Sequence, residues 1–116
     1  MESLDLKTIA RFEGVKTVPS GVVVSALATP GQQYAVYLFH GGDDKEWGAH
    51  FVGVPGQYRD QITLAAVPAG RYRLEWIEPT TGQLLKSDIV NVSGGDLVLS
   101  TPSYTLDIAM RMVRAH

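Results

Sequence analysis

Two glutamates are the first candidates for chemistry in this chain of 116 residues, because Glu75 and Glu78 lie close together in the sequence. A pair of carboxylates held about 5–10 Å apart across a cleft is what glycoside hydrolysis requires. Glu75, however, alternates with apolar residues in a strand-like pattern, and Glu78 directly precedes a proline that starts a turn. Side chains in such places are usually solvated, so we predict no catalytic residue here.

The segment from His40 to His50 holds the second group of chemically capable side chains, with three carboxylates between the two imidazoles. Imidazole and carboxylate groups are ligands for transition metals and for Ca²⁺. The acidic residues lack the alternating spacing of a calcium loop, and Lys45 lies among them. We therefore interpret the segment as an acidic hairpin tip and predict no metal and no other cofactor.

Nucleophilic catalysis is not predicted either. No serine lies in a Gly-x-Ser-x-Gly turn, and the absence of cysteine excludes a thiolate nucleophile, a disulfide or a zinc–thiolate site. The glycine pairs Gly41-Gly42 and Gly94-Gly95 lack the lysine of a nucleotide-binding loop, so they are read as turns.

Sugar binding is the functional hypothesis that the side chains themselves support. Carbohydrate-binding sites present aromatic rings beside polar groups that bind hydroxyls. The candidate rings are Trp47, Phe51 and Tyr58, and the candidate polar partners are Asp44 and Arg59. The competing interpretation, which we favour, is that the rings at 47 and 51 cover an open end of the fold.

Composition narrows the classes of function. The formal net charge of −2 offers no basic surface for nucleic acid. No apolar run approaches the roughly 20 residues that span a bilayer, so no membrane partner is expected. The first residues, Met1-Glu2-Ser3-Leu4-Asp5, lack a basic region followed by an apolar one, so the sequence as written carries no export signal.

The elements that must position these side chains are predicted to be strands. From Tyr72 to Trp76 every second residue is apolar, which predicts a strand buried on one face with Trp76 in the core. Pro79 and Gly82 then supply the dihedral angles of a turn, and 72–85 reads as one β-hairpin.

Further strands follow from the same reasoning, and the strand at 33–40 has apolar residues on both faces, which predicts a central position. A helix over Glu2–Phe12 at most is the exception, since Ser3 can cap it. We predict an all-β antiparallel β-sandwich of seven to eight strands, immunoglobulin-like or jelly-roll-like, in which 1–14 is a linker or short helix from an upstream domain and 15–116 is the sandwich. The remaining predicted strands are 22–28, 61–67, 84–92, 97–99 and 104–113.

Four segments, taken in order, carry a resemblance to a known family. The chain resembles the C-terminal β-sandwich domain of bacterial glycoside hydrolases whose catalytic part is a (β/α)8 barrel, a family named for collagen binding. The matching segments are Met1–Leu6, which is similar to the tail joining barrel to sandwich; Gln33–Leu38, similar to a YAVYL strand; Gly70–Gly82, similar to a Y-x-x-x-W-x-D-P-x-T-G hairpin; and the apolar alternation after Thr101-Pro102.

The resemblance implies a noncatalytic accessory domain whose partner is the catalytic barrel of the same enzyme. The parent enzyme would be a secreted, periplasmic or cell-surface bacterial glycoside hydrolase. Two departures stand out: Glu78 replaces the family's usual aspartate, and the stretch from Asp43 to Arg59 is longer than the usual link. The alternatives are a carbohydrate-binding module that contacts polysaccharide through 43–59, and an adhesive module that binds a protein through an apolar patch.

Overall fold

The computed structural model describes residues 10–16, 22–43, 51–53 and 56–115, with the backbone only at 42–43 and 51–53. These residues form strands and no helix. The strands are β1 (Ala10–Arg11), β2 (Val22–Thr29), β3 (Gln33–Asp43), β4 (Phe51–Gly53), β5 (Gln61–Val67), β6 (Gly70–Ile77), β7 (Leu84–Val92), β8 (Gly95–Ser100) and β9 (Asp107–Arg114).

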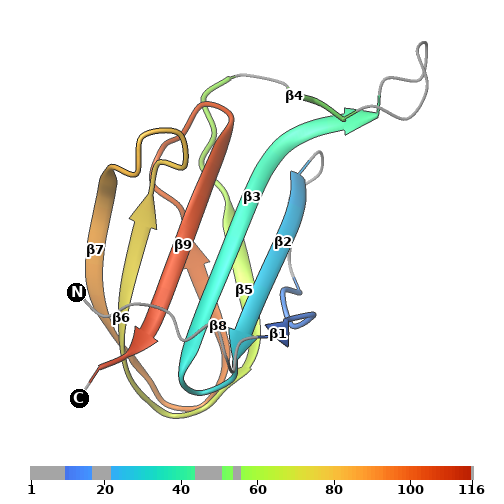
Figure 1. The fold of residues 1–116 in the computed structure, drawn as a ribbon. Helices are drawn as coiled ribbons and strands as arrows, with labels where there is room; N and C mark the ends of the chain where they lie inside the picture. The colour runs from blue at the N-terminus through green and yellow to red at the C-terminus, as the bar shows by residue number, and fades with distance from the viewer. Residues whose placement is uncertain (1–9, 17–21, 44–50, 54–55, 116) are drawn as a thin grey trace.

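Two antiparallel sheets make up the fold. The large sheet has the order β1-β2-β3-β9-β6-β7, with β4 paired to the far end of β3, and the small sheet contains β5 and β8. Figure 1 shows the large sheet in front and the small sheet behind it, while β3 extends beyond both sheets toward β4. The predicted all-β antiparallel sandwich is confirmed, with seven long strands and the short β1 and β4 in addition.

The core lies between the two sheets. Inward side chains alternate along the central strands, as the period of a strand requires. Trp76 and Tyr72 are buried on β6, as the sequence predicts, and the central place of β3 between β2 and β9 is confirmed. The other large buried side chains are Tyr34, Leu38, Ile62, Leu64, Val67, Ile108, Met110 and Met112.

The hairpin of β6 and β7 forms as predicted. Gly82 takes a φ of 75°, and its N–H donates to the carbonyl of Glu78. Glu78 Oε2 accepts hydrogen bonds from the Thr81 N–H at 2.8 Å and from the Thr81 hydroxyl at 3.0 Å. The hydrogen bond from the Thr81 N–H is the main cause of the lowered pKa of Glu78, because it stabilises the charged carboxylate. Glutamate therefore closes this turn with its own carboxylate.

The N-terminal helix prediction is wrong over Ala10 and Arg11, which form β1 and pair with Ala28 and Leu27 of β2. Phe12 is not helical either, since its N–H donates to the carbonyl of Ala26, and residues 2–9 of the predicted helix lie outside the described residues. The chain after β1 then leaves the large sheet for the small one. The backbone N–H of Lys16 donates to the carbonyl of Thr63 on β5, so 12–16 joins the two sheets along one side of the sandwich.

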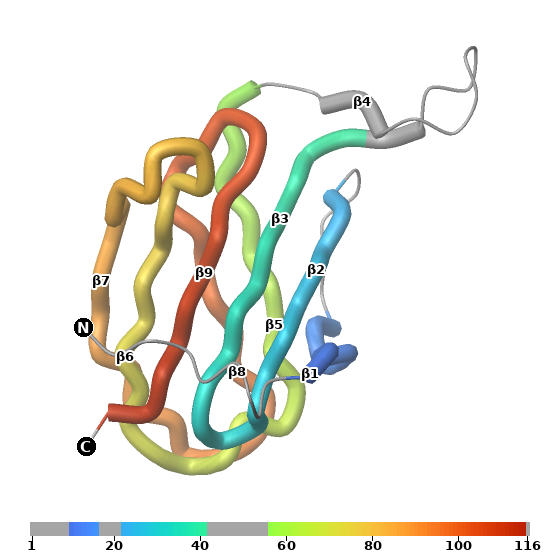
Figure 2. Tube along the Cα trace, in the orientation of Figure 1, coloured from blue at the N-terminus to red at the C-terminus, as the bar shows by residue number. Residues whose placement is uncertain are grey.

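The trace in Figure 2 follows the chain by colour from its N-terminus to its C-terminus. The strand latest in the sequence, β9, lies in the middle of the large sheet. It pairs with β3 from Gln33 to Phe39 and with β6 from Tyr72 to Ile77. The two hairpins β2–β3 and β6–β7 are therefore held together by β9.

Candidate functional site

The predicted sugar-binding residues are only partly placed by the structure. Trp47 and Asp44 lie outside the described residues, and Phe51 is described by its backbone, which pairs with Asp43. Tyr58 and Arg59 lie in the segment that leads into β5, where Tyr58 is half-buried and Arg59 is exposed. Sugar binding by this set stays a prediction.

Tyr58 has a defined packing environment. Its ring stacks on the imidazole of His40, with 3.4 Å between ring centroids and 5° between ring planes. A Cβ atom at Gly56 would lie 3.0 Å from Cζ of the Tyr58 ring, so glycine allows the chain to pass close by. Because His40 occupies one face of the ring, a sugar could stack only on the other face.

Four side chains form what we call the end cluster: His40, Tyr58, Asp60 and Tyr104. His40 Nε2 lies 2.8 Å from Asp60 Oδ2 and 2.9 Å from the Tyr104 hydroxyl, which itself donates to Asp60 Oδ2. We assign the imidazole proton to Nε2, because the carboxylate beside it can only accept. Burial, together with the hydrogen bond to Asp60, raises the pKa of Tyr104 far above its ordinary value.

The backbone reinforces the end cluster. Tyr58 and Tyr104 exchange backbone hydrogen bonds, and the Thr101 N–H donates to the carbonyl of Asp60. His40 donates its own N–H to the carbonyl of Leu106. The end cluster therefore fixes three segments at the point where β3 leaves the sandwich. Its chemistry is that of a structural network rather than a nucleophilic triad, since it holds no serine, cysteine or lysine.

Metal binding finds no support in the part of the chain that is described. Within those residues no three His, Cys, Asp or Glu side chains come together. His40, which the sequence offered as a ligand, is instead committed to Asp60 and Tyr104.

The second distinctive surface is the outer face of the large sheet, meaning the side away from β5 and β8. The register places four rows of side chains across it: Leu27, Ala35, Arg111, Glu75 and Ser87; Ser25, Tyr37, Ala109 and Ile77; Val23, Phe39 and Asp107; and Thr29, Gln33, Val113, Arg73 and Ile89. The first three rows are mainly apolar, whereas the fourth contains the polar residues Thr29, Gln33 and Arg73. A shallow depression of about 190 Å³ lies between Leu27, Tyr37 and Ala109 on this face.

One ion pair lies in this outer face. Arg111 Nη2 and Nε donate to Glu75 Oε1 at 2.7 Å and 3.1 Å. The Glu75 side chain is only 5% exposed and that of Arg111 22%. Tyr37 adds a second polar contact, since its hydroxyl donates to Asp107 Oδ2 at 2.6 Å. Glu75 is therefore neither solvated, as the sequence suggested, nor paired with Glu78.

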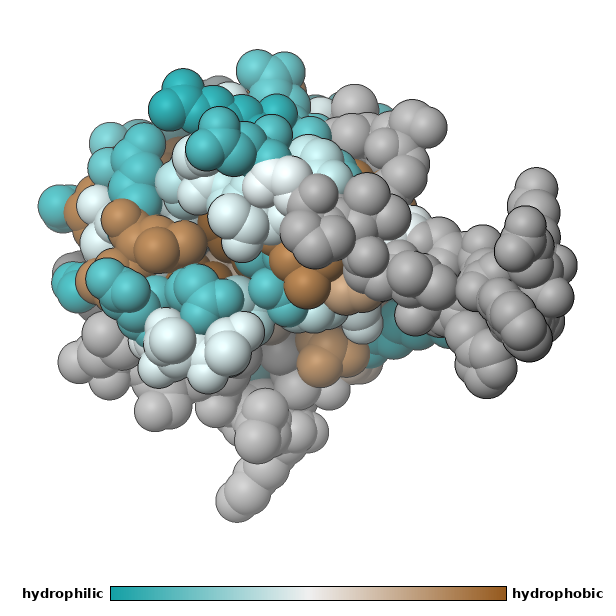
Figure 3. Space-filling model, turned by 90° about the horizontal axis from the view of Figure 1, so that it is seen from above, coloured by the Kyte–Doolittle hydropathy of each residue, from teal (hydrophilic) through white to brown (hydrophobic). Residues whose placement is uncertain are grey.

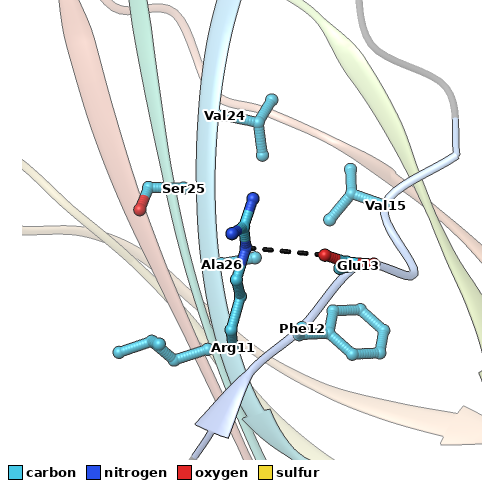
Figure 4. Close-up of a pocket in the computed structure, with 8 residues that line it drawn as sticks. Arg11, Phe12, Glu13, Val15, Val24, Ser25 and Ala26 are labelled. Atoms are coloured by element: carbon cyan, nitrogen blue, oxygen red, sulfur yellow. Dashed lines mark ion pairs between the residues drawn. The ribbon is translucent and has the colours of Figure 1, made fainter.

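An open pocket of about 470 Å³ lies at the β1 edge of the sandwich. Figure 4 shows Arg11 and Glu13 pointing toward each other across it, at 3.6 Å, with Phe12 and Val15 on the same segment and Val24 on β2. Both charged side chains are exposed, so their attraction is weak. The pocket contains no pair of groups suited to acid–base catalysis.

Viewed from the end near β4, the described surface is mixed. Figure 3 shows small hydrophobic patches set among hydrophilic residues. The described part of the chain also contains no helix long and apolar enough to cross a membrane.

Comparison with known proteins leaves the resemblance as a hypothesis. No protein-family model matches the sequence, and no curated protein matches it either.

Proposed function

We propose that this chain is a noncatalytic accessory β-sandwich domain of a carbohydrate-active enzyme, a glycoside hydrolase, and that it packs against the catalytic barrel of that enzyme. The observation that carries the proposal is the apolar outer face of the large sheet. An antiparallel sheet that faces water on one side usually presents polar side chains there. Here Val23 and Leu27 are exposed, and Ala35, Tyr37 and Phe39 continue the same apolar surface.

The state of the two glutamates supports a noncatalytic role. Glu75 is held by Arg111, and Glu78 is held by the Thr81 N–H at the hairpin turn. Both carboxylates are therefore occupied in structural contacts. The Gly70–Gly82 hairpin resembles that of the accessory domains of bacterial glycoside hydrolases, and this resemblance is the reason for proposing a catalytic barrel as the partner.

The proposal is tested by mixing this domain with a separately expressed catalytic barrel encoded in the same reading frame and measuring association by calorimetry. Leu27→Asp places a charge on the outer face and should abolish binding. Val98→Asp is the matched control, because Val98 is 59% exposed on the small sheet, and it should bind as the wild type does. A reading frame without a barrel, or equal binding by both variants, would contradict the proposal.

Sugar binding is the alternative outcome. A titration of the domain with plant polysaccharides, followed by tryptophan fluorescence, should leave the spectrum unchanged if the domain only supports the barrel. A saturable change that Tyr58→Ala or Trp47→Ala removes would favour a carbohydrate-binding module instead.

A further inference from the structure

The strand β7 forms one edge of the large sheet. The order of the sheet ends at β7, and among the described residues no strand pairs with its far side. All residues from Leu84 to Ile89 are exposed. The opposite edge is different, since β1 covers part of β2. An uncovered edge presents a row of backbone N–H and C=O groups, for which another extended strand is the complement.

The sequence of β7 is complementary to itself. When two identical strands pair antiparallel about a central residue, each residue faces the one at equal distance on the other side of the centre. About Ser87, Lys86 faces Asp88 of the second strand, and Leu85 faces Ile89. The opposite charges of Lys86 and Asp88 then face each other on one side of the joined sheet, and Leu85 and Ile89 contact each other on the other side. Both kinds of cross-strand pair are favourable.

We propose that two copies of this chain form a two-fold dimer by pairing β7 with β7 in this register. Both large sheets then join into one continuous sheet. The same residues contribute from each copy, as a closed two-fold interface requires.

The charges on β7 argue for this register in particular. Lys86 and Asp88 lie opposite Trp76 and Leu74 of β6, so they are on the side of the large sheet that faces the core. Their side chains are nevertheless 55% and 48% exposed, and they lie 3.5 Å apart as an ion pair within the strand. Charges on the inner face of an edge strand disfavour pairing with any strand that lacks opposite charges at the facing positions.

The neighbouring registers that keep the two faces aligned are unfavourable. Centred on Lys86, the two lysines face each other, and centred on Asp88, the two aspartates do. Only the register about Ser87 gives each of these charges an opposite partner. The two charges therefore select one pairing and exclude its neighbours.

Apolar residues supply the rest of the interface. Ile89, Leu85 and Leu84 are 43%, 38% and 45% exposed, so all three are accessible to a second strand. The strand pairing shifts between Trp76 and Ile77, so a bulge lies near Leu84 and Leu85. The bulge limits the ladder at that end, and we place the paired region at residues 85–89.

Charge reversal gives a sharp test. Sedimentation equilibrium of the wild-type chain at increasing concentration should show a monomer–dimer equilibrium. Lys86→Asp and Asp88→Lys should each be monomeric, because each places like charges opposite one another. An equimolar mixture of these two variants should form heterodimers, and the Lys86→Asp/Asp88→Lys double variant should regain the homodimer.

Cross-linking tests the register independently, because the chain contains no cysteine. Ser87→Cys places two thiols opposite each other with Cα atoms about 5 Å apart, within the range for a disulfide. It should give a covalent dimer on mild oxidation. Asn91→Cys, whose two copies would be roughly 26 Å apart along the strands, should not.

The proposal is overturned if the wild type stays monomeric to millimolar concentration while Ser87→Cys fails to cross-link. It is also overturned if a dimer persists unchanged in both single charge reversals, since the interface would then lie elsewhere. Near-ultraviolet circular dichroism of each variant, reporting on the packing of Trp76, confirms that loss of the dimer is not loss of the fold.

Discussion

Arg111 lies directly opposite Glu75 on the adjacent strand, and two nitrogens of its guanidinium donate hydrogen bonds to the same carboxylate oxygen. The pair is flanked in its row by Ala35 on β3 and Ser87 on β7. It is the charged contact by which β9 and β6 fix their mutual position on the outer face. A charge so nearly buried is stable only while its partner is present.

Replacing one member of this pair should therefore lower the free energy of unfolding more than replacing both members does. Arg111→Met leaves Glu75 charged and almost buried, and we expect a loss of about 3 kcal/mol in the free energy of unfolding. Glu75→Leu/Arg111→Met should recover most of that loss. Urea denaturation of the two variants and the wild type measures the difference. If the double variant is no more stable than the single one, the pair does not act as a unit.

Trp76 should be the most costly single truncation in the core. It is 1% exposed and lies opposite Met110 of β9. Trp76→Ala removes a large buried ring and should destabilise the fold by roughly 3–5 kcal/mol. Trp76→Phe retains much of the ring volume and should cost less. Thermal denaturation followed by far-ultraviolet circular dichroism gives both values, and a small loss for Trp76→Ala would be inconsistent with its core position.

Tyr37 should make the fold sensitive to alkaline pH. Burial and the hydrogen bond to Asp107 raise the pKa of Tyr37 from 10.0 to about 12. The folded chain then holds the phenolic proton more tightly than the unfolded chain does. This stabilising contribution is complete below pH 10, and it is lost as the pH rises to about 12.

The measurement compares the wild type with Tyr37→Phe, because Tyr72 and Tyr104 also have raised pKa values. The difference in unfolding free energy between the two proteins should shrink across that alkaline window. Phenolate absorbance should show one late-titrating group fewer in the variant. A constant difference at every pH would count against this assignment.

The parts of the fold that the sequence predicts are those governed by local pattern. Alternation from Tyr72 to Trp76 and the positive φ at Gly82 depend on neighbours in the chain, and both are found. The apolar residues on both faces of β3 predicted its central place. The helix prediction is wrong at Ala10–Arg11 because a capping residue such as Ser3 does not by itself fix a helix, and here pairing with β2 and the edge-on packing of Phe12 against Tyr34 determine the local structure.

The end cluster could not be predicted in the same way. His40 meets Asp60 and Tyr104 across separations of 20 and 64 residues, so no local pattern joins them. The pairing of Glu75 with Arg111, which is 36 residues away, could not be predicted from the sequence for the same reason. Antiparallel assembly creates these contacts only after the strand order is set. The polar stretch that follows Asp43 is visible in the sequence, but the position of Tyr58 and Asp60 beside His40 is not.

The position of β9 has a consequence for how this chain is made. The hairpins β2–β3 and β6–β7 leave the ribosome first, each with an apolar face and no partner between them. The large sheet can close only when residues 107–114 have been synthesised and have entered between β3 and β6. Until then Tyr34, Trp76 and their neighbours are exposed to chaperones and to other nascent chains. A premature stop shortly before Asp107 should therefore yield an aggregating product rather than a smaller folded domain.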